Sequence, residues 1–430
     1  MDYLEILDKD KNQRVVRKLL IANELIKKHT TPFLIIQQKE ILKSINLFRN
    51  YLPKVKPFFA VKSNADKYII ELLKKYNFNF DVASAGEIEL LDKLKIPGNR
   101  MILANPIKNK KSIDSACRHR VWAFTFDNIH ELVKLKNYLF EINSKFIPDA
   151  IVRIFTKSEG VQTDLSQKFG APIDDSIELI YFAKELGFNP IGVAFHVGTQ
   201  SFSSRNYEKC IQDALYVIEN VYNRYNIELN VIDIGGGFPI DTIGGTGTDN
   251  LEPFFNELYE LYNKYDLSRF KVIAEPGRII SGPCGTLITK VIGKSKRFGR
   301  NFLFLDDGVY GCYSGVIYDH AKFNFIPLDK KFIDISYKNR LVPYTLAGPT
   351  CDSIDIIDEN VMLPENIEIG DYIMSTDIGA YSIMSATTFN GFKPAKVLYL
   401  NNNDKLENEH IGIDFDIYSL NINSENYNEN

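Results

Sequence analysis

The stretch that decides the fold runs from Lys56 to Ser84 and reads KPFFAVKSNADKYIIELLKKYNFNFDVAS. Two short apolar runs, at residues 56–63 and 78–84, flank the segment KYIIELLKKY, whose apolar residues recur three and four positions apart. Apolar runs of this length are typical of strands buried on both faces, and the spacing between them predicts an amphipathic helix. The stretch is therefore one strand–helix–strand unit of a parallel sheet.

The same unit recurs along the chain until about residue 280. Six further strands are expected at Arg100–Asn105, Ala123–Asn128, Ala150–Phe155, Pro190–Gly198, Val231–Gly237 and Phe270–Gly277. Further helical patterns lie between strands at Gly86–Leu94, Ile129–Phe140 and Asp175–Gly187. Eight strands, each separated from the next by room for a helix, predict a closed (β/α)₈ barrel, with an open doubly wound sheet as the alternative.

After about residue 280 the pattern changes to strand-like runs split by glycine, proline and charged turns. This change predicts a mostly antiparallel β domain, which the N-terminal run Thr31–Gln37 is expected to join. We therefore expect a barrel over residues 38–278 and a domain of β-sandwich or β-barrel-like form built from residues 1–37 and 279–430. The polar segments 401–410 and 421–430 are expected to fray.

Composition narrows the classes of function. Among 430 residues, 51 Lys and Arg against 55 Asp and Glu give a formal net charge of −4, which offers no electrostatic reason to expect nucleic acid or a membrane as partner. No apolar run approaches the roughly 18 residues that a membrane helix needs, and the charged start is unlike a secretory signal. Five scattered cysteines, with no CxxC pair and no Cys/His cluster, predict a cytoplasmic protein without a metal site.

Polar residues and a run of three glycines stand at the carboxyl ends of the expected barrel strands, where barrels of this kind carry their chemistry. They are Lys62, Asp81, Ser84, Asn105, Asp127, Arg153, His196, Gly235–Gly237, Glu275 and Arg278. Each alone could cap a strand end. Because they recur around the whole ring, we expect them to form a polar, cleft-like mouth.

Two of these strand ends point to a specific chemistry. Lys62 ends an apolar strand, so burial would lower its pKa and favour the neutral amine that forms a Schiff base; a lysine that reaches out to solvent is the alternative. The run DIGGGFP (Asp233–Pro239) puts three backbone N–H groups where they can bind an anion, although such a run can also be a plain turn. Arg278 adds a guanidinium beside this anion site.

An imine-forming lysine beside a phosphate site fits a cofactor that carries both an aldehyde and a phosphate, which is pyridoxal 5′-phosphate. Its pyridine nitrogen needs an acid that keeps it protonated, and Glu275 is the candidate. His196 would pack on the face of the ring, or it is a hydrogen-bonded histidine at a strand end.

Eight motifs, in order from Pro57 to Phe392, resemble the barrel-type pyridoxal-phosphate amino-acid decarboxylases, and most closely those of the eukaryotic ornithine decarboxylase type. The motifs are PFFAVKSN, FDVASAGEIEL, FHVGTQ, DIGGGFP and AEPGR in the barrel, and DDGVYGCYSGVIYDHA, LAGPTCDSID and DIGAYSIMSATTFNGF in the β domain. Several are long, and they belong to the decarboxylases rather than to barrels at large.

The resemblance implies a role in cofactor binding for each matching residue. Lys62 would bind the cofactor covalently, with Glu275 on the ring nitrogen and His196 on the ring face. The residues that would hold the phosphate are Thr199, Gly235, Gly236, Gly237, Gly277, Arg278 and Tyr381. Asp81, Glu87 and Arg153 would organise the pocket around Lys62 and the ring.

The resemblance also implies a head-to-tail homodimer with two shared active sites. Cys351 and Asp352 would enter the barrel of a second copy, where the Cys351 thiol would be the proton donor. Lys168 would pair with Asp355 across the interface. The residues that would bind the substrate are Tyr318, Asp319, Asp352 and Phe389, with the two carboxylates on the distal ammonium of a basic diamino acid.

L-Ornithine, decarboxylated to putrescine in polyamine biosynthesis, is the expected substrate, and lysine is second because it is one methylene longer. Three departures from the family pattern put a strict preference in question. Ser353 replaces the common glycine in CDSID, HVGTQS brings Gln200 and Ser201 where HVGSG is more usual, and Ile240 stands where glycine is frequent.

Other readings of the same scaffold stay open. The chain could be a dual lysine/ornithine decarboxylase or an arginine decarboxylase with a roomier distal pocket. A diaminopimelate decarboxylase is expected to carry glutamate at position 352, and an alanine racemase to carry arginine at position 275. An inactive regulatory paralogue of the antizyme-inhibitor type is expected to lose cofactor-site residues, whereas Lys62, Glu275, Arg278 and Cys351 are all retained.

Overall fold

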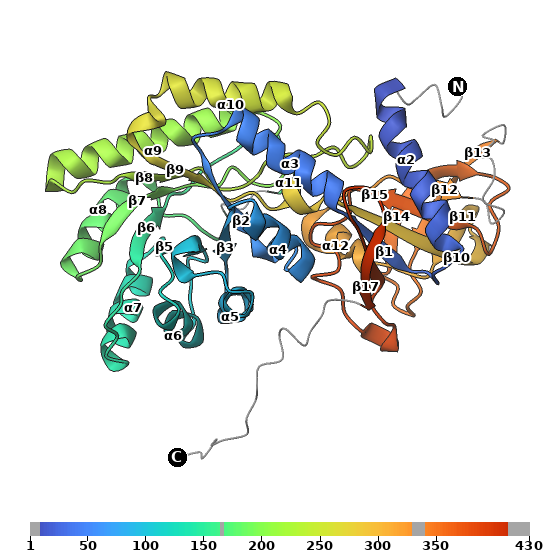
Figure 1. Cartoon of the computed structure of the whole chain (residues 1–430), viewed down its shortest axis with the longest axis horizontal. Coiled ribbons are helices and arrows are strands. Elements are labelled where there is room, and N and C mark those ends of the chain that lie inside the picture. The colour runs from blue at the N-terminus through green and yellow to red at the C-terminus, as the bar shows by residue number, and fades with distance from the viewer. Residues whose placement is uncertain (1–8, 164–166, 329–339, 412–430) are drawn as a thin grey trace, which may run out of the picture.

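The chain folds into two parts, seen side by side in the computed structural model (Figure 1), which describes residues 9–163, 167–328 and 340–411. One part is a closed barrel of eight parallel strands surrounded by helices. The other is a mostly antiparallel sheet of nine strands within the described residues. The prediction of a (β/α)₈ barrel with a β domain is confirmed, and the open doubly wound sheet is excluded.

The barrel strands follow one another around the ring in chain order, and the last closes the ring by pairing with the first. They are β2 (Lys56–Ala60), β3 (Asn79–Val82), β4 (Met101–Leu103), β5 (Ala123–Phe126), β6 (Asp149–Arg153), β7 (Pro190–Ala194), β8 (Val231–Asp233) and β9 (Lys271–Ala274). Parallel pairing turns every carboxyl end toward the same mouth. Residues that are far apart in the sequence therefore meet there.

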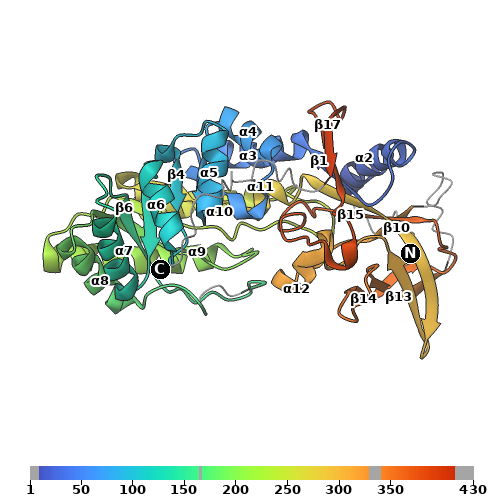
Figure 2. The same ribbon diagram turned by 90° about the horizontal axis from the view of Figure 1, so that it is seen from below.

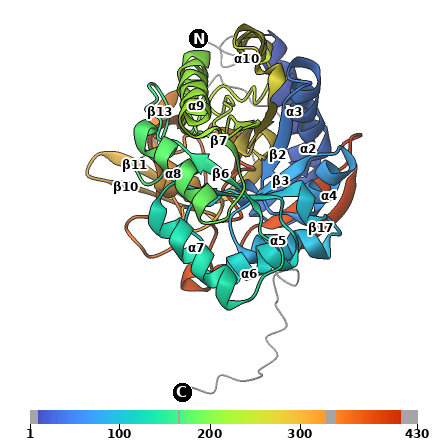
Figure 3. The same cartoon turned by 90° about the vertical axis from the view of Figure 1, so that its left-hand side faces the viewer.

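Helices cover the outside of the ring, as Figure 3 shows. They are α3 (Gln38–Tyr51), α4 (Lys67–Lys75), α5 (Ala85–Lys93), α6 (Lys110–Arg118), α7 (Ile129–Glu141), α8 (Ile173–Glu185), α9 (Ser204–Tyr225), α10 (Glu252–Lys264) and the short α11 (Arg278–Ser281). Short 3₁₀ turns lie at Val61–Ser63, Gly98–Arg100 and Leu267–Arg269. The four helices expected from apolar spacing end within two residues of their predicted bounds.

Side-chain caps explain why several of these helices begin where they do. Asp66, Ser84, Asn109 and Asn128 each accept a hydrogen bond from a backbone N–H in the first turn of the helix that follows. Such caps satisfy N–H groups that have no partner inside the helix, and each is worth about 1 kcal/mol.

Two apolar cores hold the barrel. Inside the ring, Phe58, Ile102, Ile151, Val231 and Ile273 fill the space, so the barrel has a packed interior. Between ring and helices lies a larger core. That core contains an aromatic cluster in which Phe255 of α10 meets Phe48 at 5.3 Å and Phe238 at 6.0 Å between ring centroids.

The β domain takes in the N-terminal strand, as predicted. The strand β1 (Phe33–Gln37) pairs antiparallel with β10 (Gly285–Arg297) and parallel with β16 (Lys396–Leu400). The remaining strands are β11 (Arg300–Leu305), β12 (Ile326–Leu328), β13 (Leu341–Ala347), β14 (Ile356–Pro364), β15 (Tyr372–Thr376) and β17 (Leu406–Ile411). The helix α12 (Gly315–Asp319) and the 3₁₀ turns Cys312–Ser314 and Phe389–Gly391 lie in the loops.

One prediction for this domain was wrong. Residues 401–410 do not fray, because β17 adds to the edge of β16 as an antiparallel strand and Lys396 pairs with Glu409 at 2.7 Å. The edge of β16 supplies backbone partners that a polar segment can use without an apolar face. Residues 421–430 lie outside the described part of the chain.

The helix α2 (Lys9–Ile26), which the sequence reading did not anticipate, packs on the sheet, as Figures 1 and 2 show. Its residues Val15, Ala22, Leu25 and Ile26 share a second core with Phe33 and other side chains of the sheet. The N-terminal segment thus belongs to the β part by its packing as well as by strand β1.

All five cysteines are free thiols, and Cys351 alone among them is exposed. Within residues 9–163, 167–328 and 340–411, no helix is both long and apolar enough to cross a bilayer.

We expect Phe255→Ala to lower the free energy of unfolding by about 3–5 kcal/mol, because Phe255 is fully buried and its removal leaves a cavity among aromatic rings. Phe140→Ala on α7 is the matched control, since Phe140 is 85% exposed; we expect a change within about 0.5 kcal/mol. Urea unfolding followed by circular dichroism measures both. Equal effects of the two substitutions would contradict the described packing.

Candidate active site

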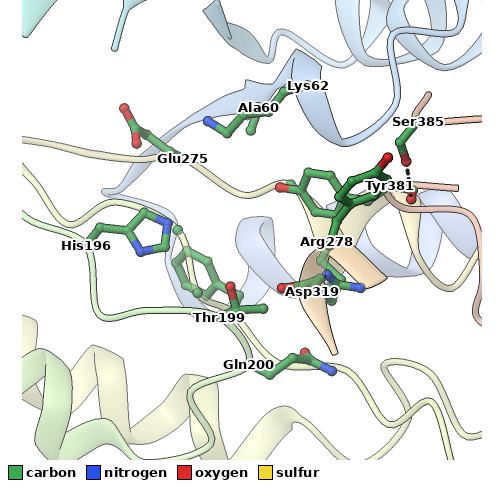
Figure 4. Close-up of a pocket in the computed structure, with 15 residues that line it drawn as sticks. Ala60, Lys62, His196, Thr199, Gln200, Glu275, Arg278, Asp319, Tyr381 and Ser385 are labelled. Carbon is green, nitrogen blue, oxygen red and sulfur yellow. Dashed lines mark hydrogen bonds and ion pairs between the residues drawn. The ribbon is translucent and has the colours of Figure 1, made fainter. Parts of the chain in front are cut away.

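A cavity of about 320 Å³ opens at the carboxyl ends of the barrel strands (Figure 4). Side chains from both parts of the chain line it. Twelve of the lining residues are Lys62, His196, Thr199, Gln200, Gly236, Gly237, Glu275, Gly277, Arg278, Tyr318, Asp319 and Tyr381. Eleven of these twelve were predicted as cofactor or substrate residues; Gln200 was noted only as a departure from the family pattern. The structure thus brings these predicted residues together in one cavity at the barrel mouth.

Lys62 lies in the 3₁₀ turn that follows β2, and its Nζ contacts Asp81 Oδ2 at 2.6 Å. Figure 4 shows its side chain extending toward Glu275. Desolvation lowers the pKa of Lys62, but the carboxylate of Asp81, in direct contact with the amine, raises it above its ordinary value. The expected neutral amine is therefore wrong, because Lys62 is an ammonium ion that faces an acid.

The side chain of Lys62 is 48% exposed toward the pocket, so its amine can be reached from the cavity. The amine has to pass its proton on before it can act as a nucleophile, and Asp81 is in hydrogen-bond contact with it.

Glu275 and Asp233 form a coupled pair of acids beside Lys62. Desolvation, followed by the charges of Asp233 and Asp81, raises the pKa of Glu275 well above its ordinary value. Desolvation also raises the pKa of Asp233, which is fully buried. Two neighbouring carboxyl groups cannot both ionise cheaply in such a place, so the pair holds a proton at neutral pH.

Asp233 is a site residue that the sequence reasoning did not assign a role, although it ends the seventh barrel strand in the quoted DIGGGFP motif. Its Oδ1 accepts a hydrogen bond from the Gly235 N–H at 2.9 Å, while its Oδ2 has no partner among the described residues. Arg153 supplies positive charge near both acids.

His196 is a neutral imidazole. Desolvation, then the positive charges of Arg153 and Lys62, holds the pKa of His196 well below its ordinary value. Its Nδ1 accepts a hydrogen bond from the Gly198 N–H at 3.1 Å, which leaves the proton on Nε2. A flat, uncharged ring that faces the cavity can stack on an aromatic ligand.

The loop after β8 has the form of an anion cradle. Gly235 and Gly237 have φ of +63° and +89°, and a Cβ at either position would overlap the carbonyl oxygen of Phe195 or Gly198, so only glycine fits. In the described part of the chain, the N–H groups of Gly236, Gly237 and Gly277 donate to no protein acceptor. These free donors beside a guanidinium are what a phosphate needs.

Arg278 and Asp319 form an ion pair at this cradle. Thr163 also donates to Asp319, from Oγ1 to Oδ1 at 3.2 Å, and the Arg278 guanidinium lies 5.1 Å from the centre of the Tyr381 ring. The Nε of Arg278 is buried with no partner among the described residues. Arg278, predicted to bind the phosphate, and Asp319, predicted to bind the substrate, thus neutralise each other.

The donors fit pyridoxal phosphate. The amine of Lys62, in contact with an acid, matches the aldehyde, and the proton-bearing carboxyl pair matches the pyridine nitrogen. The flat neutral imidazole matches the ring face, and the cradle of unused N–H groups matches the phosphate.

A second cluster lies on the β domain and outside the pocket. Cys351 is exposed, and its N–H and thiol both face Asn390 Oδ1, at 3.1 and 3.3 Å. Tyr310 donates to Asp352 Oδ2 at 2.5 Å and stacks on Phe389 with ring centroids 4.4 Å apart. The cluster holds three predicted site residues, Cys351, Asp352 and Phe389, which do not line the pocket of the same chain.

The sequence reasoning assigned no role to Tyr310 or Asn390. Both stand inside quoted motifs, DDGVYG and TTFNGF, so the motifs were the signal that could have found them. Their contacts fix the two side chains, Asp352 and Cys351, that do carry a predicted role.

The predicted pairing of Lys168 with Asp355 stays a prediction. Lys168 is exposed, as the pairing requires. Asp355 is only 2% exposed, and its carboxylate accepts from the Val309 N–H at 2.9 Å and the Thr350 Oγ1 at 2.7 Å.

Comparison with known families gives the site its context. The family described as pyridoxal-dependent decarboxylase, pyridoxal binding domain, matches residues 38–282. The chain belongs to this family. Residues 38–282 are its pyridoxal-binding domain, pyridoxal phosphate is its cofactor, and the protein is a carboxy-lyase.

The names of the curated relatives include decarboxylases with different substrates and one antizyme inhibitor. The lysine/ornithine decarboxylase of Selenomonas ruminantium is 36% identical over 86% of this chain and 89% of its own length. A probable ornithine decarboxylase of Dictyostelium discoideum is 33% identical over 90% and 83%. Antizyme inhibitor 2 of Xenopus laevis is 34% identical over 85% and 80%.

The similar solved structures also include enzymes that are named for different substrates. A double mutant of SrLDC in complex with PLP superposes with a TM-score of 0.79 at 34% identity, over 89% of this chain and 94% of that chain. The lysine/ornithine decarboxylase of Vibrio vulnificus with cadaverine gives 0.78 at 30%, over 89% and 98%. The arginine decarboxylase of Paramecium bursaria Chlorella virus gives 0.79 at 29%, over 89% and 100%.

Glu87 provides a test of the electrostatics of the site. Desolvation raises its pKa to about 7, despite the hydrogen bond that the Ala83 N–H donates to it, and Asp81 adds to the rise. Between its ordinary pKa of 4.5 and 7 the folded protein binds more protons than the unfolded chain, so this group makes the fold less stable as pH rises. We expect Glu87→Gln to gain on the order of 2 kcal/mol relative to the parent between pH 4.5 and 8.

Denaturant unfolding of the cofactor-free protein across this pH range measures the difference. Glu260→Gln on the exposed face of α10 is the control and should track the parent at every pH. A flat difference for Glu87→Gln would mean that Glu87 ionises normally.

Proposed function

We propose that this carboxy-lyase decarboxylates L-ornithine to putrescine, as a step of polyamine biosynthesis, with L-lysine as a slower second substrate. The observation that carries the proposal is that Lys62, Glu275, Arg278 and Asp319 line a single cavity. One cavity then has an amine for an aldehyde, an acid for a ring nitrogen, a cradle for a phosphate and a carboxylate for a distal ammonium.

Each proposed role follows from the chemical group that the residue presents to the cavity. Lys62 would hold the aldehyde, Glu275 would give its proton to the ring nitrogen, and His196 would support the ring face. The backbone N–H groups of Gly236, Gly237 and Gly277 would hold the phosphate with Arg278. When bound, the cofactor ring accepts the electron pair that a departing carboxylate leaves. Asp81, in contact with the Lys62 amine, is the acceptor for the proton that this amine must lose.

Substrate choice is proposed to rest on Asp319. Once a phosphate occupies Arg278, the carboxylate of Asp319 loses its partner and needs another cation. A diamino acid offers one at its distal end, whereas a neutral amino acid would leave the charge unpaired at a cost of several kcal/mol. Ornithine and lysine differ by one methylene, which a pocket distinguishes by about 1–3 kcal/mol.

A second copy of the chain is proposed to complete the site. Cys351, Asp352 and Phe389 are presented on the β domain, outside the pocket of their own protomer. In a homodimer with shared sites, the exposed thiol of Cys351 would deliver the proton that replaces the lost carboxylate, and Asp352 would join Asp319 at the distal ammonium. Five free thiols fit the proposed cytoplasmic location.

Two other functions have support among the relatives. An arginine decarboxylase shares the fold, and antizyme inhibitor 2 of Xenopus laevis is as similar in sequence as the enzymes are. Retention of Lys62, Glu275, Arg278 and Cys351 favours an active enzyme over a regulator.

The substrate proposal is tested by carbon dioxide release from L-ornithine, L-lysine, L-arginine and diaminopimelate, measured side by side on the cofactor-loaded protein. We expect the highest kcat/KM for ornithine, with lysine roughly 10- to 200-fold lower. Faster release from arginine or diaminopimelate would reject the proposed substrate, and no release from any of them would support a regulatory role.

Asp319→Ala separates substrate binding from cofactor binding in the same assay. We expect kcat/KM for ornithine to fall by about 100-fold or more, because the distal ammonium loses its carboxylate. The yellow colour of the bound cofactor should persist, since Arg278 is then free for the phosphate. Asp114→Ala on the outer face of α6 is the control. Loss of colour in Asp319→Ala would show that this residue serves the cofactor.

Mixing two inactive variants tests the shared sites. Lys62→Ala removes the amine of the pocket, and Cys351→Ala removes the thiol of the β domain. In an equal mixture half of the dimers are mixed, and each keeps one intact site of two, so about a quarter of the parental activity should return. No recovery after unfolding and refolding the two chains together would mean that each protomer completes its own site.

A further inference from the structure

Gln200, in the loop after β7, and Ile240, in the loop after β8, meet in one contact at the edge of the pocket. The amide of Gln200 bonds both backbone groups of Ile240. The Ile240 N–H donates to Oε1 at 2.8 Å, and Nε2 donates to the Ile240 carbonyl at 3.0 Å. Figure 4 shows Gln200 across the pocket from Lys62.

Gln200 holds this contact in an unfavourable backbone conformation. Its φ is +57°, in the left-handed region that costs a residue with a side chain and suits glycine. The residue is 8% exposed, and both ends of its amide are satisfied by Ile240. A strained residue that makes two buried hydrogen bonds to one neighbour indicates a constraint on that neighbour.

The neighbour belongs to the glycine loop after β8, residues 235–240. Two other contacts hold the carbonyls of the same loop. The Tyr207 hydroxyl donates to the Gly236 carbonyl, and the Ser201 N–H donates to the Gly237 carbonyl, both at 2.9 Å. In a trans peptide the C=O and the following N–H point in opposite directions. Fixing these carbonyls outward therefore turns the N–H groups of Gly237 and Phe238 away from Tyr207 and Ser201.

Gln200 closes the far end of this loop. Tyr207 and Ser201 fix its middle, and without the Gln200 amide the segment from Phe238 to Ile240 loses both of the contacts that Gln200 makes with it. Those contacts tie the loop after β8 to the loop after β7, which also carries Thr199.

We propose that Gln200 is a positioning residue for the cofactor phosphate: it clamps residues 235–240 so that their backbone donors stay directed at the anion. The inference rests on the proposed placement of the phosphate at Gly236, Gly237 and Arg278. The clamp joins the Gln200 side chain of one loop to the Ile240 backbone of the other.

The test compares pyridoxal phosphate with pyridoxal, which lacks the phosphate, by absorbance titration of the cofactor-free full-length protein. Gln200→Met keeps the length of the side chain and removes both hydrogen bonds. We expect the Kd for pyridoxal phosphate to rise about tenfold, the scale of one or two net hydrogen bonds, and the Kd for pyridoxal to stay unchanged. Gln37→Met, the same change at a buried glutamine of β1, is the control and should alter neither Kd.

Gln200→Gly provides a second readout and serves if Gln200→Met does not fold. It removes the clamp but relieves the left-handed backbone, so the melting temperature of the cofactor-free protein should hold while the Kd for pyridoxal phosphate rises. A residue that only stabilises the fold would lower the melting temperature and leave the preference for the phosphate intact.

Equal weakening of both ligands, or no change in either, overturns the clamp. Arg278→Ala separates that failure from a failure of the proposed site. If Arg278→Ala abolishes the preference for pyridoxal phosphate and the Gln200 variants do not, the clamp is wrong and the phosphate placement stands. If none of these variants alters the preference, the phosphate placement is wrong.

Discussion

A balance of charge at the base of the barrel mouth is the constraint on which the site depends. Asp81, Asp233 and Glu275 lie near two cations, Lys62 and Arg153, and desolvation raises the pKa of both Asp233 and Glu275. Each group sets the protonation of the others: the acids keep Lys62 charged, and their mutual repulsion keeps a proton on the Glu275–Asp233 pair. Pyridoxal phosphate held by Lys62 and Glu275 would change both sides of this balance together.

Much of the architecture could be read from the sequence because it follows from short-range rules. Nearly continuous apolar strands and the helical spacing between them identified the barrel, and parallel closure then brought the strand ends together. The helix α2 and the strand β17 escaped because tertiary contacts stabilise them: α2 through the core around Phe33, and β17 through the backbone edge of β16.

At the site, the sequence does not show the charges and contacts that arise only when distant residues meet in the fold. Lys62 was expected to be neutral, since position in a strand indicates burial but does not reveal which acid lies 2.6 Å away. Asp233 and Tyr310 act through contacts with other site residues, and no pattern along the chain displays such contacts. Gln200 and Ile240 are 40 positions apart, and only the fold shows that the two departures from the family pattern touch each other.

The strand β1 has a consequence for how the protein is made. Its five residues, FLIIQ, are fully buried between β10 and β16, yet the ribosome completes the whole barrel before the first residue of β10 is synthesised, and β16 follows a hundred residues later still. During elongation this apolar segment has neither of its partner strands to pair with. The buried position of β1 can therefore form only after the C-terminal part of the chain has been made.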